Sequence, residues 1–444
     1  MEKQLALFLL LCSLSYLVLA FAENITLESK KYWDMREEEA KKRTVEAYHP
    51  QPFNVTNHLN FRARILQSKW LESDVGTNGT RRVLAKKYRK GCMFANPIDA
   101  CWRCQPDWEK KRRRLAKCAL GFGKGTTGGK AGRKYLVTDP SDDDMLNPKP
   151  GTLRHAVIQN QPLWIVFGKP IMRIKLKQEL IMTSHKTIDG RGSHVIIEGG
   201  AGITIQFVEN IIIHGIKFRN IVPRPGGLIR DSLTHFGLRT PSDGDAISIF
   251  GSHHIWIDHC SFSRCYDGLI DVIKGSTAIT ISNCHMTDHD KVFLFGASDQ
   301  HSEDRKMQIT IAYTHFGKGL VQRMPRCRLG FFHIVNNDYT HWLMYAIGGG
   351  MNPTIISEGN RFIAPPDLRA KEVTHRQKPN SAWDSGTWIS HGDMLVNGAT
   401  FQQSPSILQL RPYAGKMVFP MSGKYAGRAT KHAGPLKCIP RRRC

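Results

Sequence analysis

Acidic side chains are concentrated in one short stretch of the chain. The aspartates between residues 243 and 290 are Asp243, Asp245, Asp258, Asp267, Asp271, Asp288 and Asp290. Asp271 follows Asp267 by four residues, about 13 Å along a straight strand, so these carboxylates converge only if the chain bends, as Gly268 permits. Converging carboxylates repel one another unless a cation joins them, and an all-oxygen set favours Ca²⁺ over zinc or copper. The alternative is a group of solvated aspartates in turns.

Basic side chains follow the acidic stretch. Lys291 comes directly after Asp290, and the arginines Arg323, Arg326 and Arg328 surround a proline that fixes the backbone. A surface cluster of arginines is usually only a solvated face. Beside a metal site, however, guanidinium groups suit a ligand with several carboxylates, because each can bind a carboxylate through two parallel hydrogen bonds. The two clusters together predict a site for an anionic molecule.

A repeated pattern predicts the scaffold that positions these residues. Five segments superimpose, beginning at residues 211, 255, 279, 309 and 332, and each is apolar at its first, third and last positions. Coils of about 22 to 24 residues are too short for βαβ units and fit a solenoid of stacked strands. On this interpretation the first gap, of 44 residues, is close to two coils. Asp243 and Asp267, 24 residues apart, then lie side by side on adjacent turns, and the arginine cluster is expected beside the acidic one, about two coils along. The alternative is a β-sandwich with coincidental spacing.

The N-terminus predicts export. Residues 5–20 are almost wholly apolar behind Lys3, and Ala20-Phe21-Ala22 matches a cleavage site. Residues 1–22 are therefore expected to be a cleaved signal peptide rather than a membrane anchor. Three glycosylation acceptors follow, which agrees with export. The expected glycosylation sites are Asn24, Asn54 and Asn78.

Residues 23–90 are expected to form an N-terminal extension and linker ahead of a domain over residues 91–444. Alternating charges and interspersed apolar residues predict a helix over 27–48, which Pro50 and Pro52 end. The basic run at residues 110–114 resembles a nuclear localisation signal. Behind a signal peptide it is interpreted as a solvated helix face ahead of Cys118.

The charge and the cysteines agree with an exported protein. The formal net charge of +25 attracts polyanions, whether nucleic acid, anionic lipid or acidic polysaccharide, and export argues against nucleic acid. Removal of the signal peptide, with Cys12, leaves an even number of the eleven cysteines. Zinc is a weaker interpretation of the Cys101-x-x-Cys104 spacing, because no matching second pair of ligands follows. The expected disulfides are Cys101–Cys118, Cys438–Cys444 and, as a weaker prediction, Cys92–Cys104.

Several blocks of the sequence resemble the signature blocks of pectate lyase family 1. These are Trp256-Ile257-Asp258-His259, Asp267-Gly268-Leu269-Ile270-Asp271 and Arg323-Met324-Pro325-x-x-Arg328. Asn96-Pro97-Ile98-Asp99 with Cys101-Trp102-Arg103-Cys104 is similar to the plant branch, which includes pollen lyases and related allergens. The resemblance implies an all-β fold, a right-handed single-stranded parallel β-helix with a small N-terminal extension.

The resemblance also implies a role for each candidate residue. Asp243, Asp267 and Asp271 match calcium ligands, and Asp245 matches a further acidic position. Arg323 matches the base that takes the C5 proton, although a guanidinium ordinarily keeps its own proton. Lys291 and Arg328 match residues that bind substrate carboxylates. The block from Trp256 to His259 is assigned a structural role in the stack.

The implied protein is a secreted, calcium-dependent enzyme of the cell wall. It cleaves (1→4)-α-D-galacturonan by β-elimination and leaves a 4,5-unsaturated non-reducing end. It is expected to be monomeric, with polygalacturonate as its partner and with no nucleic acid or membrane. The alternatives are a polygalacturonase-type hydrolase with a carboxylic acid and base pair, a calcium-independent lyase of methyl esters, and a catalytically inactive pectin-binding protein.

Overall fold

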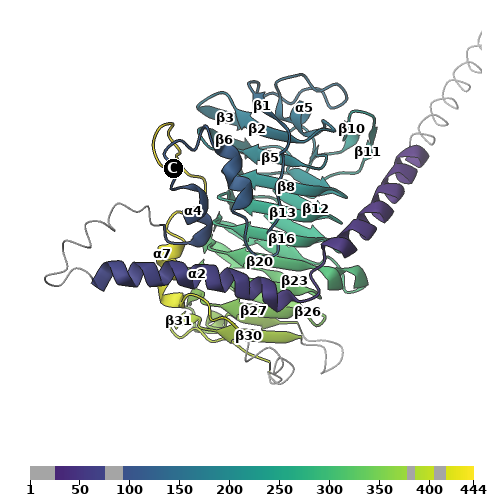
Figure 1. Cartoon of the computed structure of the whole chain (residues 1–444). Coiled ribbons are helices and arrows are strands. Elements are labelled where there is room, and N and C mark those ends of the chain that lie inside the picture. Colours follow the sequence, from purple (N-terminus) through teal and green to yellow (C-terminus); the bar gives the residue numbers. More distant parts are fainter. Residues whose placement is uncertain (1–25, 76–93, 378–385, 405–416) are drawn as a thin grey trace, which may run out of the picture.

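The computed structural model describes residues 26–75, 94–377, 386–404 and 417–444. Within these residues the chain winds into three parallel sheets of ten, nine and eight strands, and each successive coil adds one strand to a sheet (Figure 1). The predicted right-handed parallel β-helix is therefore confirmed. Each sheet pairs strands from successive coils, so residues one coil apart in the sequence become neighbours in space.

The strand bounds follow the three sheets. The ten-stranded sheet comprises β1 (Arg133–Val137), β2 (Leu163–Phe167), β5 (Lys186–Asp189), β8 (Glu209–His214), β13 (His253–Asp258), β16 (Thr277–Ser282), β20 (Gln308–Ala312), β24 (Phe331–Val335), β27 (Thr354–Glu358) and β30 (Thr387–His391). The nine-stranded sheet comprises β3 (Ile171–Ile174), β6 (His194–Glu198), β9 (Ile216–Arg219), β14 (Ser261–Ser263), β17 (His285–Thr287), β21 (His315–Phe316), β25 (Asp338–Tyr339), β28 (Arg361–Ile363) and β31 (Met394–Val396). The eight-stranded sheet comprises β4 (Leu180–Ile181), β7 (Ile203–Gln206), β12 (Ile247–Phe250), β15 (Ile270–Ile273), β19 (Phe293–Phe295), β23 (Arg326–Arg328), β26 (Ile347–Gly350) and β29 (Thr374–Arg376).

Shorter elements decorate this frame. Two small sheets add the antiparallel hairpin β10 (Gly227–Arg230) and β11 (Phe236–Arg239), and the parallel pair β18 (His289–Lys291) and β22 (Leu320–Gln322). The named helices are α2 (Pro52–Val75), α4 (Pro97–Trp102), η1 (Arg112–Lys117), α5 (Leu153–Val157), η2 (Ser302–Lys306), η3 (Leu368–Ala370), η5 (Gly423–Tyr425) and α7 (Ala426–Ala429). None of the helices in the described ranges is long and apolar enough to cross a membrane.

The five superimposed segments occupy equivalent positions in the ten-stranded sheet. Ile255 pairs in register with Ile211 on one side and Ile279 on the other, and the register continues to Ile309 and Phe332. These side chains are buried, and each buried isoleucine stabilises the fold by about 2 kcal/mol relative to an exposed one. The apolar positions of the repeat therefore form the columns of the core.

One part of the predicted repeat is wrong. The 44-residue gap between Ile211 and Ile255 is a single coil, because these two residues pair directly. The extra length is an excursion ahead of β12 that includes the hairpin β10–β11. An insertion of this kind leaves the strand register unchanged, so spacing alone does not separate it from a second coil.

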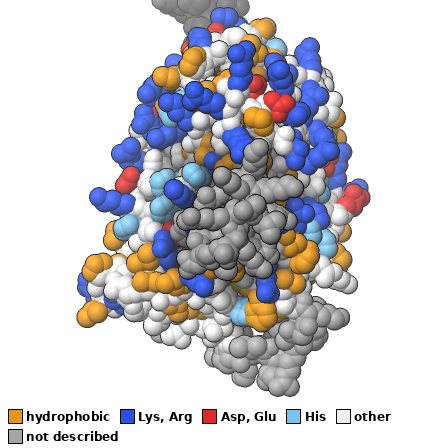
Figure 2. Space-filling view, turned by 60° about the vertical axis from the view of Figure 1, so that its left-hand side comes forward, with side chains coloured by type: hydrophobic (Ala, Val, Ile, Leu, Met, Phe, Trp, Pro, Cys, Tyr) orange, Lys and Arg blue, Asp and Glu red, His pale blue; other side chains and the backbone are white. Residues whose placement is uncertain are grey.

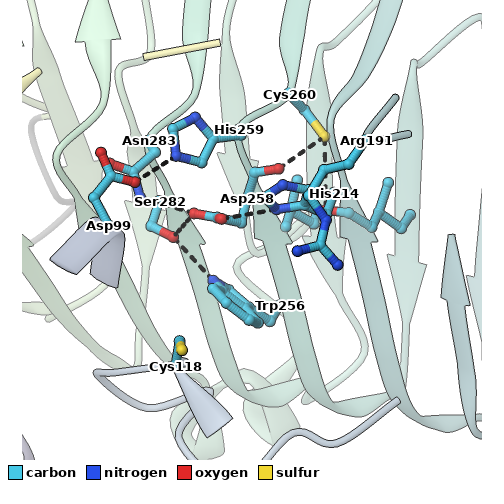
Figure 3. Close-up of polar contacts among 12 residues, drawn as sticks. Asp99, Cys118, Arg191, His214, Trp256, Asp258, His259, Cys260, Ser282 and Asn283 are labelled. Atoms are coloured by element: carbon cyan, nitrogen blue, oxygen red, sulfur yellow. Dashed lines mark hydrogen bonds and ion pairs between the residues drawn. The ribbon is translucent and has the colours of Figure 1, made fainter. Parts of the chain in front are cut away.

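The block from Trp256 to His259 lies in a buried polar cluster on the ten-stranded sheet (Figure 3). The Asp258 carboxylate accepts hydrogen bonds from His214 at 2.9 Å and from Ser282 at 2.6 Å. His259 lies 2.7 Å from the Asp99 carboxylate of α4. The Asp258 bonds join neighbouring strands and the His259 contact attaches α4 to the stack, which agrees with the structural role expected for this block.

The described cysteines test the predicted disulfides. The disulfides Cys101–Cys118 and Cys438–Cys444 are present as predicted, while Cys92 lies outside the described residues. Four cysteines in the described part of the chain are free, and none of them belongs to a predicted disulfide. They are Cys260, Cys265, Cys284 and Cys327.

The predicted N-terminal helix is confirmed, since residues 26–47 are helical, and α2 crosses the lower strands of the ten-stranded sheet (Figure 1). Asn54 is exposed near the start of α2. The signal peptide, Asn24, Asn78 and the two domain boundaries lie outside the described residues, so those predictions stay predictions.

Candidate active site

The candidate residues gather on the eight-stranded sheet and on the turns that lead into it. Ser248 of β12 pairs with Asp271 of β15, which pairs with Leu294 of β19, and Leu294 pairs with Arg326 of β23. The arginine cluster therefore lies two coils from the acidic cluster, the distance expected from the sequence.

Gly268 brings two carboxylates together. Its backbone N–H donates to Oδ1 of Asp245 at 2.6 Å, and Ser248 donates to the other oxygen at 3.1 Å. A Cβ atom on Gly268 would lie 2.3 Å from Oδ1 of Asp271 and 3.0 Å from Oδ1 of Asp245. The two oxygens are therefore at most the sum of these distances apart. These distances concern Asp245 and Asp271, and the convergence of Asp267 with Asp271 through a bend at Gly268 stays a prediction.

Burial and mutual repulsion raise the pKa values of Asp245 and Asp271. Burial, followed by the charge of Asp267, raises the pKa of Asp245 to about 6 against the opposing Gly268 hydrogen bond. Burial and the charges of Asp245 and Asp267 raise the pKa of Asp271 well above its usual range, while Arg323 acts in the opposite direction. A cation would relieve the repulsion that both shifts express.

Asp243 lies at the margin of the acidic cluster. It is exposed, and its charge has the smallest of the named effects on Asp245 and Asp271. Asp267 follows in the next coil, where its backbone N–H donates to the carbonyl of Gly244 at 3.4 Å. Adjacent turns therefore bring Asp243 and Asp267 near each other, offset by one residue.

The donor set determines which metal fits. No three His, Cys, Asp or Glu side chains of the described residues are close enough to hold an ion by themselves. The available groups here are carboxylate oxygens, which suit a hard cation such as Ca²⁺, and such an ion accepts water or ligand oxygens in its remaining positions. The chemistry of these donors therefore suits calcium, and water or ligand oxygens would have to supply most of its shell.

Lys291 and His289 approach the acidic cluster from the β18–β22 pair. The Lys291 ammonium donates to Oδ1 of Asp267 at 2.7 Å. His289 Nε2 lies 2.5 Å from the carbonyl oxygen of Asp267. Lys291 pairs in register with Gln322, the residue before Arg323, so the parallel pair places these two cations on adjacent turns.

The arginines differ in how firmly the protein holds them. Arg323 has a φ of 62°, and its Nε is buried with no hydrogen-bond partner among the described residues. Arg328 donates from Nε to Asp299 at 2.9 Å and from Nη1 to the carbonyl of Gly296 at 2.7 Å. Burial, then the charges of Arg328 and Arg323, lower the pKa of Arg326. Arg328 is thus held by two hydrogen bonds, whereas the Arg323 Nε has no partner among the described residues.

Sequence reasoning missed three residues that support the site. Ser248 donates to the Asp245 carboxylate, His289 contacts the backbone carbonyl of Asp267, and the Tyr345 side chain interacts with Arg323. Ser248 could have been found, because it lies one coil of 23 residues before Asp271. Tyr345 follows an irregular turn and has no signal of this kind.

Comparisons with known proteins identify the family of the chain. The family model described as pectate lyase matches residues 125–406, and the model described as pectate lyase, N terminus, matches residues 24–84. A pectate lyase of Lilium longiflorum is 53% identical over 418 residues, 94% of each chain. A pectate lyase of Nicotiana tabacum is 57% identical over 374 residues, which is 83% of this chain and 94% of the relative.

A solved structure extends the likeness to three dimensions. The crystal structure of jun a 1, the major allergen from cedar pollen, matches with a TM-score of 0.73 and 42% identity. The match covers 77% of this chain and 99% of the allergen. With a family model over more than half of the chain and relatives this similar over most of their length, the chain belongs to the pectate lyase family.

Proposed function

We propose that this pectate lyase is calcium-dependent and cleaves de-esterified galacturonan by β-elimination, as a secreted monomer in the plant cell wall. The observation that supports this proposal best is the approach of the Asp245 and Asp271 carboxylates around Gly268, with the Arg323 charge close enough to act on Asp271. Crowded anions beside cations suit a substrate with a carboxylate on every sugar.

Each candidate residue has a task in this proposal. Asp243, Asp267 and Asp271 would hold calcium, with Asp245 as a further acidic neighbour. Bound calcium would supply positive charge that withdraws electrons from the uronate carboxylate. Lys291 and Arg328 bind substrate carboxylates, and Arg328 is already oriented by Asp299.

The bond changes follow from the chemistry of the uronate. Arg323 takes the proton from C5, the electron pair of that C–H bond forms the C4–C5 double bond, and the C4–O bond breaks with its electrons on the leaving oxygen. Arg323 must be neutral to accept the proton.

The test is ultraviolet absorbance of the unsaturated product on polygalacturonate, with Ca²⁺ and with a chelator. We expect product only with calcium. Asp267→Asn or Asp271→Asn should weaken calcium binding, and the circular dichroism spectrum should stay that of the parent because the fold is retained. New reducing ends without absorbance would indicate the hydrolase alternative. Binding without either product would indicate an inactive pectin-binding protein. Unchanged calcium dependence in both variants would refute the ligand assignment.

A further inference from the structure

A basic depression lies on a different part of the fold from the acidic cluster. It has a volume of about 870 Å³ and borders β1 and β2 of the ten-stranded sheet, through Lys134 and Trp164. Eight of its lining residues are basic and one, Glu109, is acidic. The basic residues are Lys110, Lys111, Arg112, Arg113, Arg114, Lys117, Lys130 and Lys134. Figure 2 shows lysine and arginine side chains outnumbering acidic ones over the upper part of the face that it presents.

The arginines of the basic depression are fixed in place. The Cys101–Cys118 disulfide closes the loop that contains η1. Arg112 donates to the buried Asp189 carboxylate at 2.9 Å and stacks over Trp108 at 4.7 Å. Arg113 and Arg114 donate to the carbonyls of Gly132 and Cys101. An anion that binds here therefore meets positive groups that lose little conformational freedom on binding.

Most lysines of the basic depression have no acidic partner among the described residues, so their positive charge is not neutralised. Lys111 pairs with Asp107 at 3.0 Å. No ion pair within the described part of the chain neutralises Lys110, Lys117, Lys130 or Lys134, and three of the four are exposed. Glu109 accepts a hydrogen bond from the backbone N–H of Arg441. Like charges gathered in a hollow attract an anion with several charges more strongly than scattered ones do.

We propose that the basic depression is a second binding site for de-esterified galacturonan, which anchors the polymer while another stretch of the same chain occupies the acidic cluster. This inference rests on the proposed function, which supplies a polymer with one carboxylate per sugar. A polymer that engages two sites binds the second one at high effective concentration. A short oligomer reaches only one of them, so the anchor acts on polymer alone.

The test compares two variants of the full chain that lose the same net charge. The anchor variant replaces with serine the four lysines that have no ion pair: Lys110, Lys117, Lys130 and Lys134. The matched control replaces with serine four exposed lysines elsewhere on the surface: Lys30, Lys42, Lys69 and Lys175. Binding of polygalacturonate is measured at low salt without calcium, and turnover is measured on polygalacturonate and on trigalacturonate.

We expect the anchor variant to bind polygalacturonate about tenfold more weakly, since several exposed charge pairs are lost together. Its KM on the polymer should rise, its turnover of trigalacturonate should stay at the parental value, and the control should retain parental polymer binding. Equal weakening in both variants would show an effect of net charge alone and overturn the proposal. Parental binding by the anchor variant would overturn it as well.

The experiment also distinguishes nucleic-acid binding at the basic depression, and failure of the proposed elimination reaction, from the proposed anchor. Lysine-dependent binding to duplex DNA, with no such dependence for polygalacturonate, would assign the basic depression to nucleic acid and overturn the proposal. The binding measurement needs no turnover, so a failure of the proposed elimination reaction is distinguishable from a failure of the anchor. If the fourfold variant does not fold, the Lys117→Ser, Lys134→Ser pair tests the same site with smaller effects.

Discussion

The ammonium group of Lys291 lies 2.7 Å from Oδ1 of Asp267, so a residue proposed to bind substrate neutralises a carboxylate proposed to bind calcium. The two side chains are 41% and 38% exposed, so solvent screens their attraction. On the proposed assignment, lysine and calcium would compete for one carboxylate, and the substrate would compete for the lysine.

Removing that lysine should separate the two roles. In Lys291→Gln we expect the affinity for Ca²⁺ to rise by about twofold to fivefold, the value of one screened ion pair. The KM for polygalacturonate should rise, because a carboxylate partner is lost. Calorimetric titration with Ca²⁺ and steady-state kinetics measure the two effects. Lys306→Gln, at an exposed site with no carboxylate partner among the described residues, is the control. Unchanged calcium affinity would show that Asp267 is not a ligand.

Gly268 should be needed for its small size. A Cβ atom there would lie 2.3 Å from Oδ1 of Asp271, so Gly268→Ala must displace one or both carboxylates. We expect calcium affinity to fall by about 10- to 100-fold, the usual result of disturbing the groups around metal ligands. Gly168→Ala is the control, because its Cβ would meet no atom closer than 3.4 Å. Parental calcium affinity in Gly268→Ala would mean that Asp245 and Asp271 do not act together.

Arg323→Lys and Arg328→Lys both keep the positive charge but should have different kinetic effects. Arg323→Lys keeps the positive charge but loses the planar guanidinium, so turnover should fall about a hundredfold or more with little change in KM. Arg328→Lys loses the fork held by Asp299 and Gly296, so its KM should rise. Steady-state kinetics on polygalacturonate at saturating Ca²⁺ distinguish them. Near-normal turnover with a raised KM in Arg323→Lys would place the base elsewhere.

The buried cluster around His259 should make stability depend on pH. Burial opposes protonation of His259, but the charges of Asp99 and Asp258 outweigh it and raise its pKa. The stabilising contribution of a group with a raised pKa is complete below its unfolded pKa and is lost as pH rises through the folded one.

His259→Gln should therefore lower the free energy of unfolding by about 3 kcal/mol at pH 5, the cost of breaking a buried ion pair. The difference from the parent should shrink toward pH 9. Denaturant unfolding across this range measures it, with His341→Gln at an exposed site as the control. A difference that is constant with pH would show that His259 is neutral in the folded protein.

Local and periodic features of this protein were predictable from sequence. The apolar repeat determined the columns Ile211, Ile255 and Ile279, because a coil of fixed length places equivalent residues in register. The same periodicity predicted that Asp271 and the arginine cluster lie two coils apart. The disulfides Cys101–Cys118 and Cys438–Cys444 were predictable because each closes a short loop.

Only the tertiary structure decided how the turns are shaped and which side chains meet there. The excursion between Ile211 and Ile255 was misread as a coil, because an insertion in a turn does not alter the strand register. The bonds of Asp245 to Gly268 and of Lys291 to Asp267 depend on turn conformations without a periodic signal. The basic depression joins residues 110–117 to Lys130 and Lys134 by packing alone. A repeating backbone determines which residues are neighbours, whereas packing and turn dihedral angles determine where their charged atoms lie.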